Sequence, residues 1–159
     1  MLAFISLAAL VPASAYTVSF VVAETGLPEE QGVSEYSNFW ESGLLDVFFD
    51  AGHIVSNAPV LRLAATPSKQ LPDEAAGTLS EADASGAEYF VLALLDYQEI
   101  SASSASPAPR PKQVSIRLFK MNPFRFVREE KFAGSANTRF GDDFISAKRA
   151  GMKILPYLE

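Results

Sequence analysis

Apolar and polar residues alternate along several short stretches of this chain, a pattern that predicts β-strands. Residues Tyr16 to Ala23 alternate in this way, and Val21 adds apolar character to the second face. Residues Tyr89 to Tyr97 are apolar at almost every position. A strand of that kind must be covered on both faces, by helices or by a partner. We therefore expect two buried strands, one near each end of the first hundred residues.

Two other segments carry apolar residues at helical spacing. The first follows Ser34 and Ser37, either of which can cap a helix, and it should end at Gly52. The second opens at Asp142 and Asp143, whose carboxylates suit the positive end of a helix. The inward stripe of the first helix is Tyr36, Trp40, Leu44, Val47 and Ala51. That of the second is Phe144, Ala147, Gly151, Ile154, Leu155 and Leu158.

The segment between these helices holds weaker signals. Residues His53 to Ser56 predict a short strand, which Pro59 restricts in length or places at an edge. Residues 61–78 show no clear period. Residues Asp73 to Ser85 are rich in alanine and acids, and they predict a short helix that Gly86 ends.

A hairpin is expected in the last third of the chain. Residues 114–119 and 125–132 alternate as strands around the Asn122-Pro123 turn, and the Ser/Ala/Pro-rich stretch 101–111 before them predicts a mobile loop. The element order is then β-α-β-α-β-β-β-α. The fold class that follows is α/β (α+β), a mixed sheet of four to five strands with helices packed on it.

The amino-terminal residues predict export. Leu2 to Val11 is an apolar run broken only by Ser6, too short to span a bilayer, and the small residues Ala13 to Ala15 follow it. We expect residues 1–15 to be a signal peptide cleaved between Ala15 and Tyr16, and residues 16–159 to form one periplasmic or secreted domain. Because no Lys or Arg precedes the run, a start upstream of Met1 stays open. We expect no membrane span in the mature chain.

Composition narrows the kinds of chemistry and anchoring to be expected. The chain has no cysteine, so we expect no disulfide, no lipid anchor and no thiolate metal site. The one histidine, His53, follows a helix-ending glycine, and no G-x-S-x-G elbow or phosphate loop is present. We expect no catalytic residue, no metal and no cofactor, and we interpret the chain as a non-enzyme.

Charge is unevenly distributed along the chain. Residues 1–100 hold fourteen acidic and two basic residues, whereas residues 101–159 hold five acidic and eleven basic ones, within a net charge of −6. Either the two halves attract each other within one fold, or a basic face meets an acidic partner. The basic hairpin residues that would form this partner-binding face are Arg117, Lys120, Arg125, Arg128 and Lys131. Overall acidity and export argue against nucleic acid as the partner.

The layout of these elements resembles a superfamily of bacterial envelope accessory domains. The matching segments are Phe48 to Pro59, Ser85 to Tyr97 and the hairpin, and the step Gly86-Ala87-Glu88-Tyr89 opens the central strand. The superfamily includes the amino-terminal domain of the Tol–Pal translocation protein, the lipoprotein activators of penicillin-binding proteins and the curli-secretion lipoprotein. The resemblance implies protein–protein adaptor work in the envelope, without shared catalytic residues.

Two functions follow as hypotheses. The first is an exported, non-enzymatic envelope adaptor that acts through contacts with another envelope protein. The alternative is a periplasmic module that binds a small ligand in an aromatic pocket near Trp40 and Tyr97.

Overall fold

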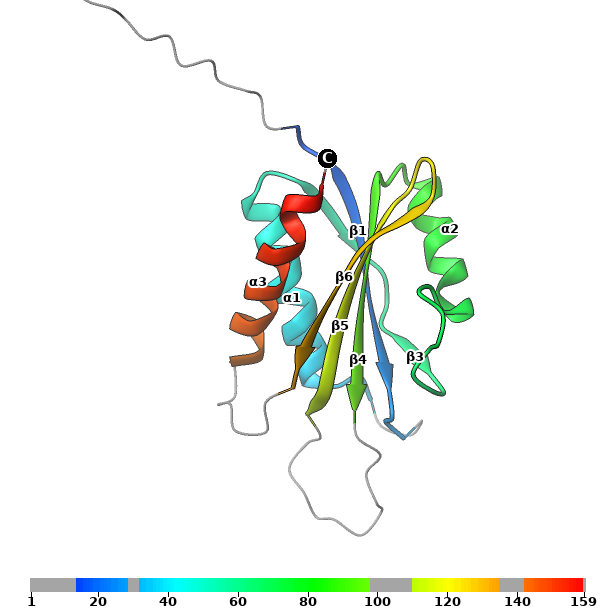
Figure 1. Cartoon of the computed structure of the whole chain (residues 1–159), viewed down its shortest axis with the longest axis vertical. Coiled ribbons are helices and arrows are strands. Elements are labelled where there is room, and N and C mark those ends of the chain that lie inside the picture. The colour runs from blue at the N-terminus through cyan, green and yellow to red at the C-terminus, as the bar shows by residue number, and fades with distance from the viewer. Residues whose placement is uncertain (1–13, 29–31, 98–109, 135–141, 159) are drawn as a thin grey trace, which may run out of the picture.

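The computed structural model describes residues 14–28, 32–97, 110–134 and 142–158 (Figure 1). In chain order the strands and helices are β1 (Thr17–Thr25), α1 (Glu35–Asp50), β2 (Ile54–Asn57), β3 (Leu61–Leu63), the 3-10 turn η1 (Asp73–Ala75), α2 (Ala76–Ala84), β4 (Tyr89–Tyr97), β5 (Pro111–Lys120), β6 (Arg125–Ala133), α3 (Asp142–Ile154) and the 3-10 turn η2 (Leu155–Tyr157). Most of the expected signal peptide, residues 1–13, and most of the expected loop, residues 101–109, lie outside the described residues.

The strands form one mixed, six-stranded sheet in the order β2-β1-β4-β5-β6, with β3 also paired to β1. Strand β1 is parallel to β2, β3 and β4, whereas β4, β5 and β6 form an antiparallel meander. Both pairing modes agree with the sequence-based expectation, because a helix separates β1 from β2 and a short turn joins β5 to β6.

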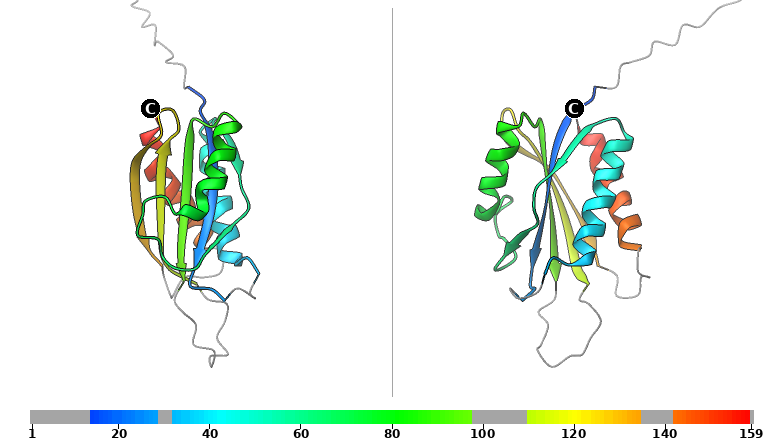
Figure 2. Two further views of the ribbon diagram at one scale, coloured as in Figure 1. Left: turned by 90° about the vertical axis from the view of Figure 1, so that its right-hand side faces the viewer. Right: turned by 180° about the vertical axis from the view of Figure 1, so that it is seen from behind.

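Helices cover the sheet on both faces, as the doubly apolar strands require. Helices α1 and α3 lie on one face and α2 lies on the other (Figures 1 and 2). Alternate residues of β1 point to the two sides: Val18, Phe20 and Val22 join the core under α1 and α3, while Val21 and Ala23 join the core under α2. The predicted mixed sheet with packed helices is therefore confirmed.

One additional strand and one strand boundary differ from the sequence-based expectation. Strand β3 was not predicted, because three residues are too few to show a period, and pairing with β1 alone gives them strand geometry. Strand β5 begins at Pro111 rather than at Val114, and a proline is tolerated at the first position of a strand. The sheet thus has one strand more than the four to five expected.

A buried carboxylate, Glu24, joins three elements at the carboxyl end of β1. Its side chain is fully buried, and its Oε1 accepts hydrogen bonds from the Ser34 backbone N–H at 2.9 Å and from the Ser37 hydroxyl. Its Oε2 lies 2.9 Å from Arg62 Nε, an ion pair without good hydrogen-bond alignment. The Ser37 hydroxyl also lies 3.0 Å from the Tyr97 hydroxyl, so β4 joins the network.

This network fixes the start of α1. Ser34 is the cap, since its side chain accepts from the Tyr36 N–H at 3.3 Å, while Ser37 is one turn inside and faces Glu24. Arg62 holds the preceding loop by donating to the Pro28 and Gly32 carbonyls at 3.1 and 2.6 Å. Of the two capping residues that the sequence leaves open, the structure selects Ser34.

Helices α1 and α3 run in the same direction and pack very closely. A Cβ on Gly43 would lie 2.6 Å from the Phe144 carbonyl oxygen and 2.7 Å from Ala147 Cβ, so only glycine permits this approach. Lys148 of α3 forms ion pairs with Asp46 and Asp50 of α1 beside this contact. Within the described ranges, no helix is both long and apolar enough to cross a membrane.

We expect Glu24→Ala to lower the free energy of unfolding by about 3–5 kcal/mol, because it leaves the partners of a buried ion pair without their acceptor. Glu74→Ala removes an exposed carboxylate of η1 and serves as the control, with an expected change within about 0.5 kcal/mol. Urea denaturation followed by circular dichroism measures both. Equal stabilities of the two variants would show that Glu24 does not stabilise this end of the sheet.

Candidate functional site

A cavity of about 400 Å³ opens between α1, α3 and the edge of the sheet formed by β5 and β6. Its volume falls in the range typical of small-molecule sites, roughly 300–1,000 Å³. Its apolar walls are Trp40, Pro111, Val114, Phe132 and Ala133. Its polar and charged walls are Lys131, Asp143, Ser146, Arg149 and Lys153, and Gly134 completes the lining. We call it the Trp40 cavity.

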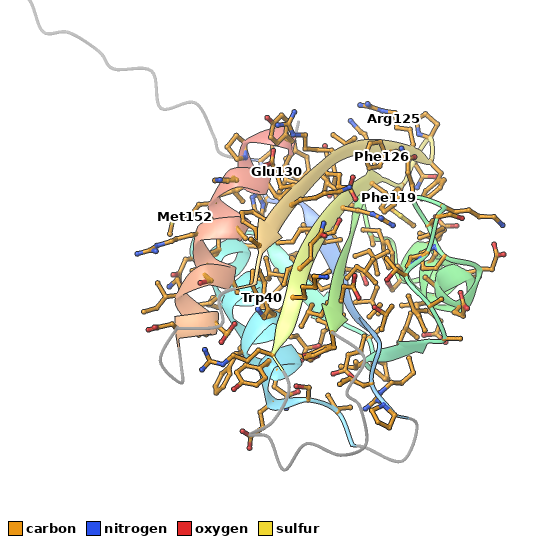
Figure 3. All side chains as sticks on the ribbon, turned by 60° about the horizontal axis from the view of Figure 1, so that its bottom comes forward. Trp40, Phe119, Arg125, Phe126, Glu130 and Met152 are labelled. Carbon is orange, nitrogen blue, oxygen red and sulfur yellow. The ribbon has the colours of Figure 1, made fainter. Side chains whose placement is uncertain are left out.

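The fold explains why these side chains meet. Trp40 lies on the sheet-facing stripe of α1, about one turn after Ser37, and the Glu24 network fixes that turn. Figure 3 shows Trp40 between α3 and strands β5 and β6. The Gly134 N–H donates to the Lys112 carbonyl at 2.7 Å, and a Cβ there would lie 1.7 Å from the Pro111 carbonyl oxygen. Only a glycine at position 134 therefore lets the end of β6 pack this closely against β5.

Two buried polar atoms in the Trp40 cavity have no hydrogen-bond partner of normal geometry among the described residues. They are Trp40 Nε1 and Asp143 Oδ2, and Trp40 is only 3% exposed. Burial raises the pKa of Asp143 above its usual 3.8, although the indole N–H that faces it and the charge of Arg110 act in the opposite direction. The indole N–H therefore faces the Asp143 carboxylate without forming a hydrogen bond of normal geometry, and the two groups form a poorly satisfied polar pair in the cavity wall.

The charges around the cavity are mostly positive. Lys131, Arg149 and Lys153 line it with Asp143 as the one acidic lining residue. Lys153 Nζ lies 5.2 Å from the centroid of the Phe132 ring, a cation–π contact, and the Phe132 ring itself lies 6.2 Å from Trp40. Lys131 also lies 3.4 Å from Glu129. The site therefore combines an aromatic wall with a cationic rim.

A second hollow, of about 360 Å³, lies on the α2 face of the sheet. Its charged groups are already paired: Glu129 accepts from Ser115 at 2.6 Å and from Arg117 at 2.8 Å. Burial alone would raise the pKa of Glu129, but these hydrogen bonds and the charges of Arg117 and Lys131 outweigh it, so the pKa is lowered. Because the charged groups of this second hollow already pair with one another, we take the Trp40 cavity as the candidate site.

The structure places the two predicted pocket residues differently. Trp40 lines the cavity, whereas Tyr97 is buried at the end of β4, where its hydroxyl contacts Ser37. Burial raises the pKa of Tyr97 to about 12. Tyr97 thus shares a buried apolar cluster with Trp40 but does not line the cavity.

The five basic hairpin residues are distributed over both sides of the sheet. Arg117 is 8% exposed, and it donates to Glu129 and to the Lys69 and Gln70 carbonyls. Arg128 lies over the Tyr157 ring at 4.9 Å and pairs with Glu130. Lys120 lies near the Tyr89 ring, and Lys131 borders both hollows. Arg125 is exposed near the hairpin turn (Figure 3).

Several lining residues were not identified from the sequence as site residues. In the sequence, Asp143 looks like an acidic residue in the first turn of a helix. Arg149 and Lys153 look like residues of the solvent-exposed side of the same helix. One signal was present: residues 143, 146, 149 and 153 recur at spacings of three and four, which places them along one side of a helix. The sequence does not reveal that β6 and Trp40 lie opposite that side.

Tyr16, which follows the predicted cleavage site, lies beside His53. The Tyr16 backbone N–H donates to His53 Nδ1 at 3.2 Å, and the two rings stack with centroids 5.7 Å apart. Burial lowers the pKa of His53. Within the described part of the chain, His, Asp and Glu side chains form no group that could hold a metal ion.

Comparison with known proteins gives structural likeness without a family. No family model and no curated protein matches the sequence. Among solved structures, PelC from Paraburkholderia phytofirmans, crystallised as a dodecamer, superposes with a TM-score of 0.48 at 17% identity, covering 91% of this chain and 89% of that one. A lipoprotein from Neisseria meningitidis gives 0.44 at 9% identity, covering 89% and 99%. TolB from Acinetobacter baumannii gives 0.41 at 14% identity, covering 89% and 26%.

These likenesses concern the layout of the elements alone. The TM-scores and identities are too low to support any inference about function.

The raised pKa of Asp143 predicts a pH dependence of stability. Between the pKa of the unfolded chain, near 3.8, and the higher pKa of the folded protein, the folded state binds the extra proton, so stability falls as the pH rises through this window. We therefore expect Asp143→Asn, which keeps the shape of the side chain without its charge, to be more stable than the wild type at neutral pH and to lose that advantage below pH 3.8. Urea denaturation at a series of pH values measures this. A difference that does not vary with pH would contradict it.

Proposed function

We propose that this chain is a non-enzymatic accessory protein of the bacterial envelope that binds a small ligand in the Trp40 cavity. The observation that carries the proposal is a cavity of ligand size whose wall includes the buried Trp40. The Trp40 N–H and the Asp143 carboxylate face each other there without a hydrogen bond of normal geometry, so a polar group of a ligand can pair with either of them.

The lining supports binding of an apolar molecule with a polar group. Trp40, Val114 and Phe132 give the ligand an apolar surface, while Ser146 and the basic rim give it polar contacts. Small-molecule sites combine apolar walls and a few placed polar groups in this way. Placement in the envelope is supported by the predicted signal peptide at residues 1–15.

We expect binding to be visible through Trp40 itself, which is the single tryptophan of the chain. The probes are octanoate, octan-1-ol and octylammonium, which share a chain length and differ in charge. At least one should change the tryptophan emission and raise the melting temperature, because a ligand that binds only the folded state stabilises it.

A cavity-filling variant gives the matched control for this experiment. Ser146→Phe adds a ring inside the cavity and should abolish the rise in melting temperature, whereas Ser80→Phe, on the exposed side of α2, should leave it unchanged. The proposal fails if no probe gives a response, or if Ser146→Phe responds as the wild type does.

The hairpin turn favours a second function, that of a protein adaptor. Phe124 is 48% exposed and stacks on Phe119 with centroids 5.5 Å apart, and the neighbouring Arg125 is exposed. An exposed aromatic ring beside a cation is typical of residues that dominate a protein interface. We propose that this tip would meet an acidic envelope protein.

For the adaptor, we expect Phe124→Ser to reduce recovery of a partner about tenfold or more, as loss of a central aromatic contact does. A crosslinked pull-down from envelopes, quantified by mass spectrometry, measures recovery against Phe49→Ser, which removes an exposed ring at the end of α1. Equal recovery with the two variants would remove the hairpin tip from the interface.

A further inference from the structure

We infer that the ligand of the Trp40 cavity is a small organic anion, a carboxylate attached to an apolar body. This inference rests on the proposed function and names the chemical class that the cavity selects. It follows from three features of the lining: the position of the Asp143 carboxylate opposite the Trp40 N–H, the unpaired cations of α3 and the apolar wall opposite them.

The first feature limits where an anionic group can lie. The Trp40 indole N–H faces the Asp143 carboxylate, without a hydrogen bond of normal geometry. A second carboxylate at Trp40 would lie beside that of Asp143 and be repelled by it. The anionic group of a ligand must therefore lie toward the basic rim, with Trp40 as an aromatic part of the wall.

The second feature is that two basic side chains of the lining have no ion-pair partner among the described residues. Lys131 lies close to Glu129, but Arg149 and Lys153 form no ion pair with any described residue. They are one turn apart on the side of α3 that faces β6, and both line the cavity. Two unpaired cations at one cavity attract an anion and repel a cation, whereas the chain as a whole has a net charge of −6. The positive potential is therefore local to this site.

The third feature is the apolar wall. Pro111, Val114 and Phe132 would remain in contact with water around an inorganic anion, but an alkyl or aryl group would cover them. The Lys153 ammonium already lies 5.2 Å from the centroid of the Phe132 ring. A ligand with its anionic group at the α3 cations and its apolar body on this wall uses both parts of the lining.

The same three probes test this selection, because they differ in charge at a constant chain length. In titrations of the protein at neutral pH, followed by Trp40 emission, octanoate should bind about tenfold or more tightly than octan-1-ol, a ratio expected for a hydrogen bond to a charged group. Octylammonium should bind more weakly than octan-1-ol, and inorganic phosphate should not compete.

Variants of the two α3 cations test the charge. The double variant Arg149→Gln and Lys153→Gln should weaken octanoate about tenfold and leave octan-1-ol unchanged, while Lys69→Gln, which removes an exposed cation beside η1, should change neither.

Failure of this inference differs from failure of the proposed function. Equal affinities for octanoate and octan-1-ol would contradict the inferred anionic ligand, and so would octanoate binding that the α3 double variant does not change. Neither result would contradict the proposal that the cavity binds a small ligand. Absence of binding by all three probes would overturn both.

Discussion

Burial of the Glu24 carboxylate is the constraint on which the rest of the structure depends. A charge in the interior is tolerated only where ion-pair and hydrogen-bond partners surround it, and here those partners come from α1 and Arg62. Satisfying Glu24 therefore fixes where α1 begins, where the chain after β2 passes and how the Ser37 hydroxyl meets Tyr97 of β4. The partners that the buried charge of Glu24 requires therefore join β1, α1 and β4, which are distant in sequence.

The close contact between α1 and α3 transmits this constraint to the Trp40 cavity. Gly43 lets α3 approach α1. About one turn further along the two helices, Gly151 of α3 packs against Val47 and Leu44 of α1. With both helices fixed, the side of α3 that carries Asp143, Arg149 and Lys153 faces the end of β6 across a gap that Trp40 only partly fills. The cavity is thus a consequence of helix packing rather than of a local motif.

The sequence by itself determined much of the fold. Alternation in residues 16–23 and 89–97 required buried strands, the spacing around Trp40 required an amphipathic helix, and the turn at Asn122-Pro123 required a hairpin. These are short-range patterns, in which each residue's environment follows from its neighbours along the chain. Strand β3 was missed for the opposite reason, since its three residues become a strand only because β1 lies beside them.

Charge pairing and the site were decided by the tertiary structure alone. The basic residues of the hairpin are alike in sequence, yet Arg117 is buried and paired with Glu129 while Arg125 is exposed, because adjacent strands and the loop at Lys69 and Gln70 select their partners. Trp40 could be identified from the sequence as a residue of interest, but Arg149 and Lys153 could not. Their importance depends on which surface α3 meets, and that is set by contacts between residues about a hundred positions apart in the chain.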